Sequence, residues 1–164
     1  MIRILILCLF LFFSSSCSRH GIIKSYAYTR QSMAGMVRSD DNGRQTSPGI
    51  TTQHLLFVET DSSKGRPLWT KAWIYQQPYS IQPVKMDSPN NIIGKTMSGE
   101  DVAIRVKKGN ELWQLVLSPK QDSTEDQDLE KIKKSKILLF GTWKNKPFSY
   151  KISKDEQLQQ IEFQ

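Results

Sequence analysis

The amino-acid sequence predicts a mainly β protein, folded as a single antiparallel β-sandwich or a small β-barrel. Runs of β-branched, aromatic and aliphatic residues recur about every ten residues, with Gly, Pro, Asn and Asp between them. No long segment has the periodicity of an amphipathic helix. Of the 164 residues, 38% are hydrophobic and 24% are charged, a balance typical of a folded domain rather than of a disordered chain.

The first predicted strands are the longest. Aromatic, Thr and Val residues from Ile23 to Val37 predict a long strand, bent near Gly35. Thr51–Thr60 is the clearest strand, because it is β-branched at its start and apolar through its centre. We expect Leu68–Tyr75 to follow as another strand.

The middle of the chain contains a proline and a hairpin signal. Pro83 interrupts Tyr79–Met86 and predicts an edge strand or an irregular segment there, since proline cannot donate to a sheet ladder. Val102–Val106 and Leu112–Leu117 flank the turn sequence Lys107–Asn110, a pattern that predicts a β-hairpin.

The last third of the chain predicts a second hairpin and one short helix. Ile137–Trp143 and Phe148–Ile152 are the expected arms of the hairpin, and Leu158–Phe163 is expected to be a final strand. Earlier in the chain, Ile92–Thr96 is expected to be a further brief strand. Residues 129–136 have charges spaced for helical pairing, so we expect either a short helix or an extended linker there.

The N-terminal segment has the features of an export signal. Arg3 precedes an apolar run from Ile4 to Phe13, and the small residues Ser14–Ser16 come next. The apolar run is shorter than the roughly 20 helical residues that a membrane span requires. Cys17 follows immediately.

A cysteine directly behind such a segment resembles the signal of bacterial lipoproteins. The resemblance is limited to the signal peptide and Cys17, and it implies acylation of the Cys17 thiol. Cys8 lies in the apolar run and would leave with it, so the processed chain would hold one thiol and no internal disulfide. A secreted protein with a free Cys17 thiol is the alternative.

These features divide the chain into a signal peptide at 1–16, a tether at 17–24 and a β-rich domain at 25–164. Ser18 stands where many bacterial lipoproteins retained in the inner membrane have Asp. That resemblance predicts a lipid-anchored protein of the bacterial outer membrane, facing the periplasm, with the membrane as a partner through its anchor.

Charge and histidine content narrow the function. The formal charge is +7, but the lysines are scattered, and we expect no nucleic-acid partner for an exported protein. His20 and His54 are the only histidines, and the sequence lacks Gly-x-Ser-x-Gly, His-Glu-x-x-His and Cys-x-x-Cys. We therefore expect no metal or other cofactor, and we rank an enzyme below a non-catalytic protein.

One aromatic group is the candidate ligand-binding site. In a regular strand, alternate residues of Leu68–Tyr75 share a face, so the tryptophans, a lysine and a tyrosine would form one stripe. Such a stripe either fills the core, which residue burial tendencies favour, or lies exposed and stacks on a sugar or a peptide. The candidate residues are Trp69, Lys71, Trp73, Tyr75 and Tyr79.

Three classes of function remain open. The first is an interaction or structural module that contacts another envelope protein. The second is a binder of glycan, peptide or lipid that uses the aromatic strand face or a barrel interior. The third is a small hydrolase built on a pair of carboxylates.

Overall fold

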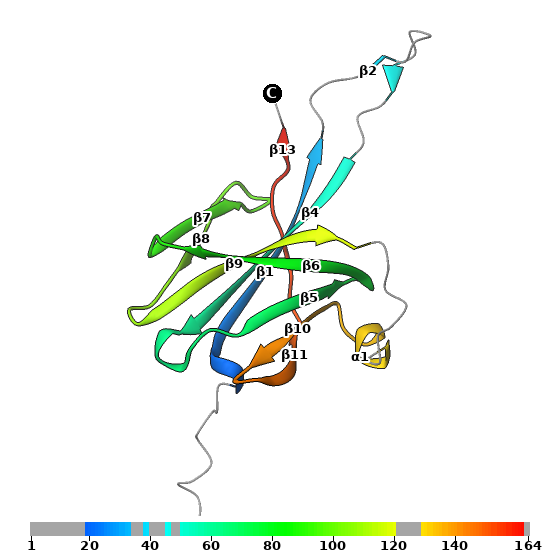
Figure 1. Cartoon of the computed structure of the whole chain (residues 1–164). Helices are drawn as coiled ribbons and strands as arrows, with labels where there is room; N and C mark the ends of the chain where they lie inside the picture. Colours follow the sequence, from blue (N-terminus) through cyan, green and yellow to red (C-terminus); the bar gives the residue numbers. More distant parts are fainter. Residues whose placement is uncertain (1–18, 34–37, 40–44, 47–49, 121–128, 163–164) are drawn as a thin grey trace, which may run out of the picture.

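A computed structural model describes residues 19–33, 38–39, 45–46, 50–120 and 129–162. Strands dominate these residues, which confirms the mainly β prediction (Figure 1). The described residues contain one α-helix, α1 (Leu129–Lys133), inside the segment for which a short helix was an expected alternative. The whole predicted signal peptide, residues 17–18 of the predicted tether, which include Cys17, and the predicted bend at Gly35 lie outside the described residues.

The main sheet has nine strands among the described residues. Its order is β11-β10-β5-β6-β9-β4-β1-β12, and β13 also pairs with β1. The bounds are β1 Ile22–Met33, β4 Ile50–Asp61, β5 Leu68–Ile74, β6 Gln77–Met86, β9 Asn110–Pro119, β10 Ile137–Trp143, β11 Lys146–Ile152, β12 Glu156–Gln157 and β13 Ile161–Glu162.

Two small sheets and two single turns complete the described elements. Strands β7 and β8 form one antiparallel pair, and the two-residue strands β2 and β3 form another. The bounds are β2 Arg38–Ser39, β3 Gln45–Thr46, β7 Asn90–Lys95, β8 Asp101–Arg105, and the 3-10 turns η2 Arg19–Gly21 and η3 Ser62–Lys64.

The main sheet curls into a half-barrel around a filled core (Figure 1). Alternate residues of its strands point inward, as the two-residue period of a strand requires. The hydroxyl groups of Ser25 on β1 and Tyr150 on β11 lie 3.3 Å apart, which brings the two ends of the curl together. The inward-facing core includes Leu56, Val58, Trp69, Trp113, Leu115, Leu139 and Phe148.

A second core lies on the outer face of the half-barrel. Tyr28, Phe57 and Leu112 point outward from β1, β4 and β9, and they pack under Ile104 of the β7–β8 pair and Leu158. The small sheet therefore gives this side of the molecule the two layers of a sandwich.

The predicted hairpin between residues 102–106 and 112–117 is wrong. Both segments are strands, but β8 pairs with β7, whereas β9 pairs with β4 and β6. The turn itself forms, with the Asn110 N–H donating to the Lys107 carbonyl at 3.0 Å. Because both edges of Leu112–Leu115 in β9 are occupied by β4 and β6, β8 pairs elsewhere.

Pro83 lies in an interior strand of the main sheet, rather than in the edge strand or irregular segment that was predicted. β6 is continuous from Gln77 to Met86 and lies between β5 and β9. However, β5 pairs only with Gln77–Ser80, so beyond Ser80 β6 has β9 as its one partner among the described strands. Pro83 thus occupies a stretch in which one side of the strand forms no ladder, and a missing N–H is tolerated there.

Two other boundaries also differ from the predictions. The domain begins before residue 25, because Ile22 starts β1 and is buried in the core at 4% exposure. The predicted strand from Leu158 to Phe163 is divided: Leu158 forms only an isolated bridge to Thr96, and pairing with β1 occurs in β12 and β13.

A β-bulge joins β5 to β10. Phe140 pairs with Lys71 and the next residue, Gly141, pairs with Trp69, so Thr70 is the extra residue on β5. At this point the backbones of β5 and β10 approach closely, since a Cβ atom on Gly141 would lie 2.3 Å from the Leu68 carbonyl oxygen. Glycine at position 141 is what allows the bulge to pack.

We predict that Gly141→Ala lowers the free energy of unfolding by roughly 2–3 kcal/mol, because the added methyl group displaces the backbone of β5. Urea unfolding measures this loss. Gly99→Ala is the control: its φ is 91° and its Cβ site has no atom within 4 Å, so only a backbone cost of about 1 kcal/mol is expected. Equal losses in the two variants would contradict the close approach.

Candidate functional site

The two ends of the half-barrel differ in character. At the end where β10 finishes, the His20 ring stacks on Phe148 with centroids 4.6 Å apart and meets Trp143 edge-on at 6.0 Å. At the end where β10 begins, the Tyr75 N–H donates to the Lys136 carbonyl at 2.8 Å. The N-terminal segment enters the domain at the end where β10 finishes, and a polar cluster occupies the end where β10 begins.

This polar cluster, which we call the mouth cluster, consists of Thr29, His54, Tyr75, Tyr79 and Asp155. The His54 ring contacts both tyrosines, with centroid distances of 6.0 Å to Tyr75 and 6.1 Å to Tyr79. Its Nδ1 atom is 3.5 Å from the Thr29 hydroxyl. Residues from three strands and two connections therefore meet at this end.

Asp155 anchors the C-terminal segment to the mouth cluster. Its carboxylate accepts a short hydrogen bond from the Tyr75 hydroxyl, and Lys136 Nζ lies 3.6 Å from its other oxygen. The hydrogen bond from Tyr75, together with the Lys136 charge, lowers the pKa of Asp155 below 3.8. The same bond raises the pKa of the Tyr75 hydroxyl.

His54 is neutral at physiological pH. Burial lowers its pKa below 6.5, because an imidazolium loses hydration in this half-buried position, and the negative charge of Asp155 only partly opposes the shift. The ring therefore acts as an aromatic surface and a hydrogen-bonding group rather than as a cation.

The turn that carries Tyr75 is strained. Tyr75 and Gln76 form the two-residue connection between β5 and β6, and both have positive φ, 48° and 68°. Such turns favour Asn and Gly, since other residues have an unfavourable Cβ contact in this conformation. The sequence has neither Asn nor Gly at these two positions, and Tyr75 was predicted to be the last residue of the strand.

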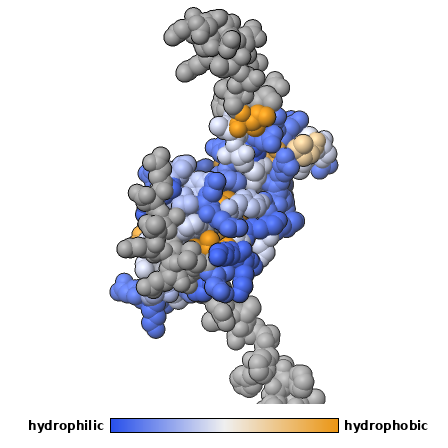
Figure 2. All heavy atoms as spheres, turned by 90° about the vertical axis from the view of Figure 1, so that its right-hand side faces the viewer, coloured by the Kyte–Doolittle hydropathy of each residue, from blue (hydrophilic) through white to orange (hydrophobic). Residues whose placement is uncertain are grey.

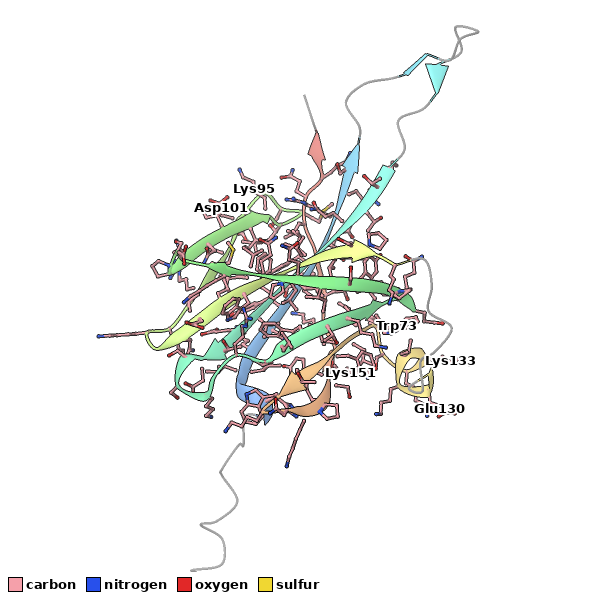
Figure 3. All side chains as sticks on the ribbon, viewed as in Figure 1. Trp73, Lys95, Asp101, Glu130, Lys133 and Lys151 are labelled. Atoms are coloured by element: carbon pink, nitrogen blue, oxygen red, sulfur yellow. The ribbon has the colours of Figure 1, made fainter. Side chains whose placement is uncertain are left out.

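The predicted aromatic stripe is wrong because of the bulge at Thr70. Trp69 and Trp73 are both buried, at 2% and 6% exposure, but Trp69 lies in the main core and Trp73 packs with Ile132 and Leu138 on the other face. Figure 3 shows Trp73 beside α1. The expectation that these tryptophans are core residues is confirmed.

The structure divides the five predicted site residues among three places, of which the main core holds Trp69. Lys71 lies on the face of Trp73, with its Nζ atom 5.2 Å from the centre of the Phe140 ring. Tyr75 and Tyr79 instead meet at the mouth cluster, where they join His54, Thr29 and Asp155. Sequence reasoning treated His54 as an ordinary strand residue, because its partners come from distant segments.

Two hollows flank the mouth cluster. One, of about 430 Å³, is lined by residues that include Thr52, His54, Tyr79 and Leu117. The other, of about 380 Å³, is lined by residues that include Thr52, Tyr75 and Asp155. Figure 2 shows a largely hydrophilic face with isolated apolar side chains. The first lining is mixed polar and apolar and the second is mainly polar, and their sizes suit the binding of a chain segment or a small ligand.

The part of the chain that the structure describes lacks two other types of site. Those residues contain no group of three or more His, Cys, Asp or Glu side chains placed to hold a metal ion. No helix within them is long and apolar enough to span a membrane. Comparisons with family models, with curated proteins and with solved structures found no match.

We predict that Gln76→Gly raises the free energy of unfolding by about 1 kcal/mol, because glycine adopts positive φ without a Cβ contact. Thermal unfolding measures the gain. Asn145→Gly is the matched control, since Asn145 lies in the other two-residue turn with φ 59° and asparagine already tolerates that conformation. A gain in the control as large as in Gln76→Gly would argue against strain at Gln76.

We predict that Tyr75→Phe destabilises the protein at neutral pH by about 1 kcal/mol, below the usual range for a bond to a carboxylate because Tyr75 is half-exposed. The native pKa of Asp155 is lowered, so this stabilisation is complete above 3.8 and is lost as the pH falls through the native pKa. Urea unfolding against pH should therefore show the two proteins converging in acid.

Tyr79→Phe is the control for this pH dependence. Its hydroxyl donates to the neutral Gln77 side chain at 3.3 Å, so the effect of removing it is expected to be the same at every pH. A Tyr75→Phe difference that persists below the native pKa of Asp155 would contradict the assigned bond.

Proposed function

We propose that the protein is a bacterial envelope lipoprotein, anchored through acylated Cys17, and that it acts as a non-catalytic module that binds a partner at its mouth cluster. The observation that carries this proposal is the separation of the two ends of the half-barrel. Cys17 precedes Arg19 by two residues, and η2 packs beside Trp143 at the end opposite the mouth cluster. An anchor there leaves the mouth cluster free to meet a partner.

The contacts of His54 support a binding role over a catalytic one. A nucleophile requires a base within hydrogen-bonding distance and a third group that orients the base. The Thr29 hydroxyl lies at the 3.5 Å limit from His54, and the carboxylate of Asp155 is engaged by Tyr75 and Lys136 instead. The geometry therefore favours contact with a partner rather than acyl transfer.

The filled interior favours one of two modes of ligand binding. Large side chains such as Trp69, Trp113 and Phe148 occupy the inside of the curled sheet. A lipid ligand inside the barrel would have to displace them, so binding at the rim is favoured.

We place the protein at the outer membrane facing the periplasm, on the basis of Ser18 after the proposed lipidated cysteine.

Binding of a glycan at the mouth cluster is a second candidate function. The observation that favours it is the pair of tyrosines in contact with a neutral His54, next to hydroxyl and amide side chains. Aromatic rings pack against the C–H face of a sugar, and amides and carboxylates bind its hydroxyl groups.

We predict that Cys17→Ala moves the protein from the membrane fraction to the soluble periplasmic fraction, because the thiol that carries the lipid is lost. Intact mass of the wild-type protein from native envelopes should show diacylglycerol on Cys17 as its first residue.

Cys8→Ala is the matched control, since this cysteine lies in the apolar run that is removed and its loss should change neither mass nor fractionation. A processed wild-type polypeptide without lipid on Cys17 would contradict the proposal.

A further inference from the structure

The main sheet splits beside the mouth cluster. β4 pairs with β1 over Ile50–Thr60 but with β9 only over Leu56–Asp61. β9 continues to Pro119 in its pairing with β6. Among the described strands, residues 50–55 of β4 and 116–119 of β9 therefore each have one edge without a partner. Figure 1 shows β4 and β9 diverging from this point.

The hollow of about 430 Å³ lies at this split. Its lining comes from both diverging strands and includes Thr51, Gln53, Val116 and Pro119. Among the residues that the structure describes, its lining includes no Asp, Glu, Lys or Arg, although these residues make up 24% of the chain. Its only titratable imidazole, His54, is held neutral by burial. A charged segment would lose hydration here without gaining an opposite charge, so the lining favours an uncharged occupant.

The open edge of β4 lacks the usual protection of an edge strand. Proteins normally shield such edges with lysine, proline or a bulge, because unpaired N–H and C=O groups recruit other strands. Residues 50–55 include none of these, and Thr51, Thr52 and Gln53 are exposed, as is Ile50 at 56%. The nearby cation Arg30 is engaged by Gln53, to which its Nε donates at 2.7 Å.

We propose that an uncharged, extended segment of a partner protein adds to β4 as a further strand in this split, with its backbone hydrogen-bonded to residues 50–55. Six residues of strand present an edge about 20 Å long, enough for a short peptide segment. This inference rests on the proposed binding role and identifies the kind of partner. Side chains of the added strand would alternate between the hollow and solvent.

The first test uses the processed chain, amide hydrogen exchange and a defined probe. The probe is a capped, uncharged peptide of about seven residues that alternates Thr and Val. At millimolar concentration it should slow exchange at backbone amides within residues 50–55 and leave those of β10 and β11 unchanged. Its counterpart with N-methyl groups on alternate amides cannot form the ladder and should bind at least about tenfold more weakly.

A pair of variants provides the second test. Thr52→Lys places a charge in the uncharged hollow at an exposed position, and it should weaken binding of the peptide at least about tenfold. Ile92→Lys adds the same charge on β7, at a residue that is 67% exposed, and should leave binding unchanged.

Several results would overturn the inference. One is full protection of the amides of residues 50–55 in the free chain, which would mean that the edge is already paired. Another is equal binding of the N-methylated peptide. A third is a response at the split to the neutral oligosaccharide chitotetraose but not to the peptide, which would establish the glycan function instead. Absence of lipid on Cys17 would contradict the anchoring proposal without affecting these measurements.

Discussion

The close approach of Gly141 to the Leu68 carbonyl is the contact on which the rest of the fold depends. It permits the bulge at Thr70, and the bulge reverses the faces of β5 on either side of it. Trp69 thereby enters the main core, while Trp73 packs under α1. One extra residue thus provides a large side chain for each of two cores and increases the local twist that helps the sheet to curl.

The curl explains why binding is proposed at the rim of the half-barrel. Tryptophans from β5 and β9 meet inside it, with the Trp69 and Trp113 centroids 6.3 Å apart, and leave the interior packed. In this curled sheet β4 and β9 do not stay paired along their whole length. They are paired over Leu56–Asp61 and separate at residues 50–55 of β4, and the unpaired backbone that results is concentrated next to the mouth cluster.

Local sequence patterns predicted most strands but not their partners. Thr51–Thr60 and the hairpin of β10 and β11 were evident, because alternation and turn residues are local properties. The pairing of β8 with β7 was missed, since the choice depends on which edges of β9 are already occupied. The mouth cluster was only partly predicted: Tyr75 and Tyr79 were candidates, but Asp155 is eighty residues from Tyr75 and no spacing rule connects them.

The C-terminal segment links the mouth cluster to the outer core. Asp155 accepts the hydrogen bond of Tyr75, and the next residues form β12 beside β1. Leu158, 2% exposed, then packs under the small sheet, and its N–H donates to the Thr29 carbonyl at 2.8 Å. Thr29 also contacts His54. The segment from Asp155 to Leu158 therefore connects the mouth cluster to the outer core, and the burial of Leu158 under β7 and β8 helps to hold Asp155 in place.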